Sequence, residues 1–286
     1  MLTIQEISKS TASWWILRLD NVQHYVRPRH LRIGREASMK IGCAATLFGF
    51  QSYTPIAVDI AKKQECIARN ERKTLTFERL HSLINYDHLD QVCTLQILRT
   101  LIHYVPSLQK HTGIVQQMYD TIVAIHRLPV CKTQIYPLPT NGRNETVTSE
   151  LLQALLDFVQ VMGFTEDEPL THLLFTGGDG LTYERMVLLK LYMQFHESSF
   201  ERLEWLKPFL ETWHTSWTDL SRIYEAHWDS LGSPDPSTLG HSANHIRRKA
   251  PSNVKKVDYY PYSQLLYQVL DARILDCCRY GYLTYT

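Results

Sequence analysis

The sequence has little glycine, no paired cysteine motif and no long apolar run. Only 12 of its 286 residues are glycine, and its six cysteines are scattered without a Cys-x-x-Cys motif. We therefore expect reduced thiols in an intracellular protein rather than a disulfide framework. No apolar run approaches the roughly 18 residues of a membrane span. The first residues also lack a signal peptide, so we expect a nuclear or cytoplasmic protein that is neither secreted nor membrane-bound.

An excess of charge of one sign is lacking as well. The formal net charge is +1, which gives no general attraction to nucleic acid, so DNA binding would need local clusters of basic residues. Two such clusters occur, at residues 27–40 and 247–256. The candidate DNA-binding residues in them are Arg27, Arg29, Arg32, Arg247, Arg248 and Lys249. The alternative interpretation is that both clusters are solvated loops, as charge runs usually are.

The pattern of apolar residues predicts an α/β protein. Residues 14–50 are rich in strand patterns, with one strand over 14–19 and another over 39–47. Residues 74–127 have a helical pattern and form an expected insertion. Thr148 or Ser149 is expected to cap a further helix, with apolar residues from Leu151 to Met162 on one face, which Gly163 closes. Residues 171–196 predict a strand, a turn and a helix, and residues 199–280 predict further helices, with an interruption near Pro208. We expect one domain over residues 1–286, with a small mixed sheet, an extensive helical insertion and C-terminal helices.

The most informative motif is Gly177-Gly178-Asp179-Gly180, between an apolar run of strand length and a helical pattern. In open α/β sheets, ligands collect at this place, because glycine lets the backbone come close and the helix N-terminus points its amides outward. Asp179 could bind Mg²⁺, act as a base or cap the helix.

A second acid, Asp20, also follows an apolar strand. If the two strands are neighbours, Asp20 and Asp179 could share a Mg²⁺ ion, which takes few protein carboxylates and keeps much of its water. The alternative is that Asp20 opens a turn and Asp179 caps a helix. The sequence does not choose a third acid among several candidates: Glu184, Glu197, Asp219 and Glu225.

The same glycine motif also resembles the nucleotide site of the NAD-kinase and lipid-kinase superfamily. That resemblance implies a phosphotransferase whose loop holds the phosphates of ATP. However, Leu181 precedes the threonine of the motif, and no glycine occurs between Gly180 and Gly232. We rank this interpretation second.

Five segments, taken in order, resemble a domain family that is expanded in mushroom-forming fungi and associated with mobile elements. The segments are Leu19-Asp-Asn-Val-Gln23, Ile41-Gly-Cys-Ala-Ala-Thr46, Gly178-Asp-Gly-Leu-Thr182, Trp213-His-Thr-Ser-Trp217 and Asp235-Pro-Ser-Thr-Leu-Gly240. The resemblance covers about residues 14–278. It implies a transposon-derived relative of transposases with a ribonuclease-H-like core, cleaving phosphodiester bonds with Mg²⁺.

In that resemblance, Asp20 and Asp179 are the first two acids of the core and the metal ligands, and Asn21 and Thr182 support the loop. Cys43 stands where a threonine is expected. A third acid normally comes from a later helix, so we expect the domain to be incomplete at its C-terminus. Whether the chain is an enzyme therefore stays open. The alternatives are an active nuclease, a degenerate copy, or a non-catalytic domain that binds DNA or protein.

Overall fold

The computed structural model describes the backbone of residues 3–10, 14–27, 29–30, 36–50, 53–125, 127 and 130–285, and side chains up to residue 280. The described residues form two compact units. Unit 1 comprises residues 1–73 and 131–215, and unit 2 comprises residues 74–130 and 216–286. The helical segment expected at 74–127 thus belongs to unit 2.

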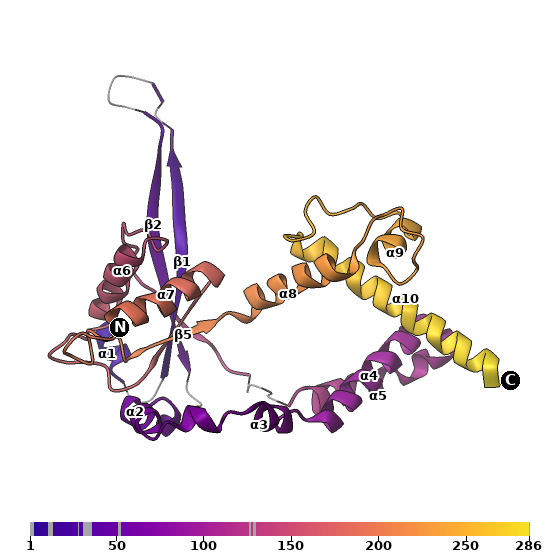
Figure 1. The fold of residues 1–286 in the computed structure, drawn as a ribbon, viewed down its shortest axis with the longest axis horizontal. Coiled ribbons are helices and arrows are strands. Elements are labelled where there is room, and N and C mark those ends of the chain that lie inside the picture. Colours follow the sequence, from indigo (N-terminus) through magenta and orange to yellow (C-terminus); the bar gives the residue numbers. More distant parts are fainter. Residues whose placement is uncertain are drawn as a thin grey trace. The chain divides into compact units, whose positions relative to one another are not determined.

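Unit 1 is built on a five-stranded mixed sheet (Figure 1). Its strands are β1 (Trp14–Val26), β2 (Ser38–Phe50), β3 (Gln134–Pro137), β4 (Leu174–Gly178) and β5 (Leu206–Leu210). Their order across the sheet is β3-β2-β1-β4-β5. The first three strands pair antiparallel, and β1, β4 and β5 run parallel to one another. The carboxyl ends of β4 and β5 therefore lie at the same edge of the sheet.

One face of the sheet is covered by α6 (Thr148–Val161) and α7 (Gly180–Met193). Side chains alternate along a strand, so the buried residues of β1 that face these helices are Trp15, Leu17 and Leu19. The apolar residues of α6 recur every three or four positions and pack on them: Leu151, Ala154, Leu155, Phe158 and Val159. Gly163, at φ +86°, ends this helix as expected. Two short helices, α1 (Ile4–Ser8) and α2 (Ile60–Ala68), complete unit 1.

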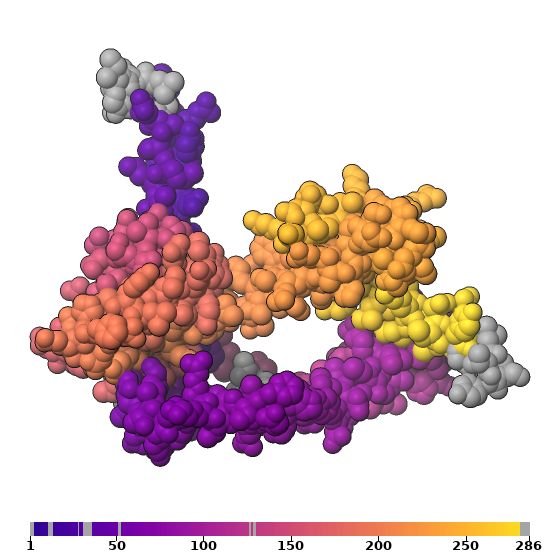
Figure 2. Space-filling model, in the orientation of Figure 1, coloured from indigo at the N-terminus to yellow at the C-terminus, as the bar shows by residue number. Residues whose placement is uncertain are grey.

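The hairpin of β1 and β2 extends beyond the other strands. The two strands pair over their full length, from Trp14–Phe50 to Val26–Ser38. In Figure 2 the outer half stands out as a narrow projection. Its large apolar side chains are exposed: Val22, Tyr25, Val26, Met39 and Ile41.

Unit 2 is helical, with a second core of its own. Its helices are α3 (Phe77–Ser82), α4 (Tyr86–Tyr104), α5 (Thr112–Met118), most of α8 (Thr212–His227), α9 (Leu239–His245) and α10 (Tyr259–Tyr285). Two short helical turns accompany them, a 3-10 helix at Pro106–His111 and a π-helix at Tyr119–Val123. Tyr224 and Trp228 stack at the centre of this core, and the Tyr224 hydroxyl donates to the Tyr262 carbonyl at 2.8 Å. None of the helices in the described part of the chain is long and apolar enough to cross a membrane.

The α/β class with a small mixed sheet is confirmed, and three details of the prediction are wrong. Residues 206–210, expected to be helical, form β5, an edge strand that tolerates Pro208 because an edge can do without one N–H donor. β1 does not end at Asp20 but continues to Val26, because its pairing with β2 continues. The N-cap of α6 is Val147 rather than Thr148 or Ser149. The single-domain organisation stays a prediction.

Candidate functional site

Asp20 and Asp179 each come two residues after the last pair that joins two neighbouring parallel strands. That last pair is Arg18 of β1 and Gly177 of β4; Asp20 is still in β1, and Asp179 follows β4 directly. Neighbouring strands are about 4.8 Å apart, and side chains alternate between the faces. Asp20 lies on the face of β1 opposite to that of Leu19, whereas Asp179 follows β4 and its carboxylate turns toward the first turn of α7. Both residues are exposed. The structure thus places one predicted acid in β1 and the other directly after the neighbouring strand β4.

Asp179 also caps α7. It has extended backbone angles (φ −67°, ψ 176°), and its Oδ1 accepts a hydrogen bond from the Thr182 amide at 2.8 Å. The glycines before it give room for neighbouring side chains. A Cβ on Gly178 would lie 2.7 Å from the Thr182 methyl carbon, and a Cβ on Gly177 would lie 2.6 Å from a Phe209 ring carbon. These two glycines are therefore needed for packing inside unit 1.

A third carboxylate, Glu145, lies buried at the same end of the sheet. It precedes α6 and is 3% exposed. Its Oε1 accepts a hydrogen bond from the Thr182 hydroxyl at 3.1 Å, and the Cys43 thiol lies 3.6 Å from its Oε2. Burial is the largest cause that raises the pKa of Glu145, and the negative charges of Asp179 and Asp20 raise it further. The hydrogen bonds from Thr182 and Cys43 oppose that rise. Glu145 is therefore electrostatically coupled to both predicted acids.

Cys43 supports Glu145 rather than acting as a nucleophile. Burial, followed by the charge of Glu145, raises the pKa of its thiol to about 12, which keeps it protonated at neutral pH. The backbone amide of Cys43 donates to the Asn141 carbonyl at 3.0 Å, and the backbone amide of Asn141 donates to the Cys43 carbonyl. This bridge fixes the segment that leads to Glu145 against β2.

A fourth acid, Glu211, follows β5 at the same level. Leu210 is paired with Gly178, and Glu211 and Asp179 are the residues that follow these two strand ends. Glu211 is 8% exposed and ion-paired with Arg18. One terminal nitrogen of Arg18 donates to Oε2 at 2.8 Å, whereas its Nε lies 2.7 Å from Oε1 with poor hydrogen-bond geometry. Arg18 thus offsets the negative charge of Glu211, the acid of this group that follows β5.

Sequence reasoning missed Glu145 and Glu211. Glu211 follows an apolar run of strand length, as Asp179 does, and the expectation of helices over residues 199–280 concealed that signal. Nothing in the sequence around Glu145 indicates that its side chain is buried beneath Thr182. Of the four acids proposed earlier as a third ligand, Glu184 is on α7 and Glu197 is in the following loop, whereas Asp219 and Glu225 are on the part of α8 that belongs to unit 2.

The carboxylates form a row rather than a closed cage. Within the described residues, no three His, Cys, Asp or Glu side chains are grouped as metal ligands. A pair of carboxylates is what Mg²⁺ commonly takes from a protein, with water and substrate phosphate in its other positions. Asp20 and Asp179 are two exposed carboxylates of this kind, and the metal itself stays a prediction.

The basic residues belong to different units and are partly outside the described residues. Arg27 and Arg29 are exposed beyond the end of β1, and Arg32 lies outside the described residues. In unit 2, Arg247, Arg248 and Lys249 follow α9 and are exposed. Arg248 donates to the side chain of Gln268 at 3.2 Å. Their role in DNA binding stays a prediction.

Comparison with known proteins supplies a family. A model of a family of unknown function, DUF6589, matches residues 70–284. This range contains Glu145, Asp179 and Glu211, whereas Asp20 precedes it. No curated protein and no solved structure matches the chain. Because the matched residues make up most of its length, the chain belongs to the family of unknown function DUF6589.

Proposed function

We propose that unit 1 is a ribonuclease-H-like domain, derived from a transposon, that cleaves phosphodiester bonds of DNA inside the cell. The observation that carries this proposal is the parallel pairing of β1 with β4, since Asp20 and Asp179 each come two residues after its last pair, Arg18 and Gly177. Two further features support it. The strand order β3-β2-β1-β4-β5, with β2 alone antiparallel to its neighbours, is the order of ribonuclease-H-like sheets. Helices α6 and α7 also connect β3 to β4 and β4 to β5 in the corresponding way.

The proposed roles follow from position and charge. Asp20 and Asp179 would hold Mg²⁺, which when bound offsets the charge that develops on a phosphate during cleavage. Asp179 is oriented by its bond to the Thr182 amide. The charges of Asp179 and Asp20 raise the pKa of Glu145, so a cation bound at the two aspartates would favour the ionised form of Glu145.

Nuclease assays test this proposal. The full-length protein is incubated with labelled single- and double-stranded DNA in Mg²⁺ or in EDTA, beside Asp20→Asn, Asp179→Asn and the control Asp167→Asn, an exposed acid of the loop before β4. Residues that merely support a metal ligand contribute about 10- to 100-fold. We therefore expect each ligand variant to lose at least about 100-fold of its Mg²⁺-dependent cleavage, and the control to lose none.

Cleavage by Asp179→Asn at the rate of the unsubstituted protein would refute the assignment of the site. If the unsubstituted protein binds DNA but cleaves none of the substrates, the result favours the alternative of a non-catalytic DNA-binding domain. The ion pair between Arg18 and Glu211, which neutralises one end of the acidic row, is the observation that favours this alternative. A phosphotransferase of the kinase type has less support, because the Phe209 ring and the Thr182 side chain already occupy the space beside Gly177 and Gly178.

A further inference from the structure

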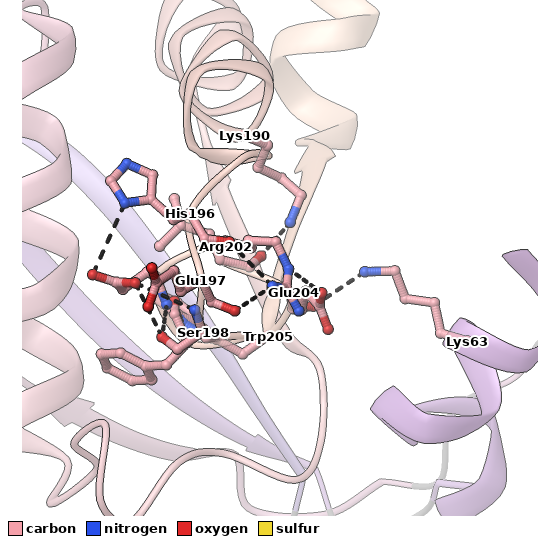
Figure 3. Close-up of polar contacts among 11 residues, drawn as sticks. Lys63, Lys190, His196, Glu197, Ser198, Arg202, Glu204 and Trp205 are labelled. Carbon is pink, nitrogen blue, oxygen red and sulfur yellow. Dashed lines mark hydrogen bonds and ion pairs between the residues drawn. The ribbon is translucent and has the colours of Figure 1, made fainter.

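Two lysines from different helices reach the same loop of unit 1. The loop connects α7 to β5, and Leu203 adopts the left-handed conformation there, at φ 53°. The Lys190 ammonium group of α7 donates to the Leu203 carbonyl, and the Lys63 ammonium group of α2 donates to the Glu204 carbonyl at 3.1 Å. Figure 3 shows both side chains directed at this loop. Because the two acceptors are consecutive carbonyls, the two ammonium groups are held close together.

The cluster has an excess of positive charge. Burial, followed by the charge of Lys63, lowers the pKa of Lys190 to about 8, and Lys207 of β5 lowers it further. Burial and then Lys207 also lower the pKa of Lys63. Among the described residues, Glu204 is the carboxylate that opposes both shifts. Its side chain is already ion-paired with Arg202 at 2.8 Å.

The ammonium groups of Lys190 and Lys63 each have N–H donors beyond the one that the described carbonyl accepts. Each ammonium group has three N–H donors, and one carbonyl acceptor is described for Lys190 and one for Lys63. Within the described residues, none of the three lysines forms an ion pair. Lys63 and Lys190 are half-buried and Lys207 is exposed, and partial removal of an ammonium group from water without a counter-charge costs free energy. The surroundings therefore favour an oxyanion, which would accept the remaining hydrogen bonds and balance the charge.

This cluster is separate from the acidic site. β4 and β5 are parallel, and the loop that contains Leu203 and Glu204 leads into the amino end of β5. Asp179 and Glu211 follow the carboxyl ends of the same two strands. The two groups of residues thus lie at opposite ends of the strands, and the inference below does not depend on the proposed nuclease activity.

We infer that Lys63, Lys190 and Lys207 form a binding site for a phosphate group, either free inorganic phosphate or a phosphate of a nucleic-acid backbone. Two of its donors are positioned by the backbone of one loop, and the third is on the adjacent strand. Lysine suits this role as a compact point charge with several rotatable donors. The bound group would replace the missing counter-charge at the start of β5.

Lysine labelling of the full-length protein tests this inference. An amine-reactive acylating reagent is applied in phosphate or in chloride at equal ionic strength, and mass spectrometry measures the rate at Lys190 and Lys63. We expect phosphate to slow labelling of both lysines in a saturable way. A bound anion raises the pKa of a nearby lysine and so reduces the fraction of reactive neutral amine. Equal rates in phosphate and chloride would overturn the inference and leave the lysines as a clamp for the loop.

Variants provide the matched comparison. Lys63→Met should weaken phosphate protection of Lys190 by at least about tenfold, because a charge-assisted hydrogen bond is lost. The control is Lys62→Met, since Lys62 is on the same helix but is ion-paired with Glu65 at 2.6 Å. Equal protection in the Lys63 and Lys62 variants would also overturn the inference. In a second arm, single-stranded DNA replaces phosphate. Protection by DNA identifies a backbone phosphate as the ligand, and protection by inorganic phosphate alone identifies free phosphate.

Discussion

Substitution of Asp179 separates its two roles, as a helix cap and as a proposed metal ligand. Asparagine caps helices about as well as aspartate, whereas alanine at an N-cap costs about 1 kcal/mol. Asp179→Asn should therefore keep the hydrogen bond to the Thr182 amide that fixes the first turn of α7. It removes the negative charge that Mg²⁺ requires. Without metal, Asp179→Asn should be destabilised by less than about 1 kcal/mol, the usual limit for a charge at a helix terminus.

The increase in the free energy of unfolding on addition of Mg²⁺ is the quantity that tests whether Asp179 is a metal ligand. A ligand at about 100 times its dissociation constant adds about 2.7 kcal/mol to the free energy of unfolding. For a unit of this size, 1 kcal/mol raises the melting temperature by about 2–4 °C, so Mg²⁺ should raise it by roughly 5–11 °C. Asp179→Asn should lose most of this increment, although its stability without metal is nearly unchanged.

Differential scanning calorimetry with and without Mg²⁺ measures both quantities in the same samples. Asp179→Ala provides the contrast, because it should lose the cap and the metal response together. Ca²⁺ at equal ionic strength controls for general screening, since it prefers more oxygen ligands than two carboxylates provide. If Asp179→Asn retains the full Mg²⁺ increment, Asp179 is a helix cap alone and the reasoning about the metal pair is wrong.

Two further substitutions test the surroundings of the site. The pKa of Glu145 is raised above the usual 4.5, so its contribution to the free energy of unfolding is full below about pH 4.5 and falls as the pH rises through the folded-state pKa. Glu145→Gln, which resembles the protonated form, should lack this fall when urea unfolding is measured from pH 4 to 8. Parallel curves of stability against pH for the two proteins would contradict the coupling. Gly177→Ala should cost about 1–3 kcal/mol, because its Cβ would lie 2.6 Å from the Phe209 ring. Gly180→Ala has open space around its Cβ in the first turn of α7 and should instead stabilise the protein by about 0.5–1 kcal/mol; the same sign of change for both alanines would refute this account of the glycines.

Local patterns predicted the elements that depend on short-range physics. The apolar run before Gly177, the capping aspartate and the helical pattern after it are adjacent in the sequence, and they form β4, the N-cap and α7 as expected. The spacing of apolar residues in α6 likewise predicts the face that is buried. Residues 206–210 were mistaken for helix because a short apolar run with a proline has no decisive period. Their strand conformation depends on pairing with β4.

The sequence by itself determined that the chain is an α/β protein and that Asp179 ends a strand and begins a helix, because those properties depend on neighbouring residues. Only the tertiary structure decided which acids meet. The pairing of β1 with β4 makes neighbours of the two strands that lead to Asp20 and Asp179. The loop before α6 buries Glu145 against Thr182, and the pairing of β5 with β4 ends just before Glu211 and Asp179. The same holds for Lys63 and Lys190, which are far apart in the chain and meet at one loop. Such contacts depend on strand register and helix packing across the whole unit, which no local pattern encodes.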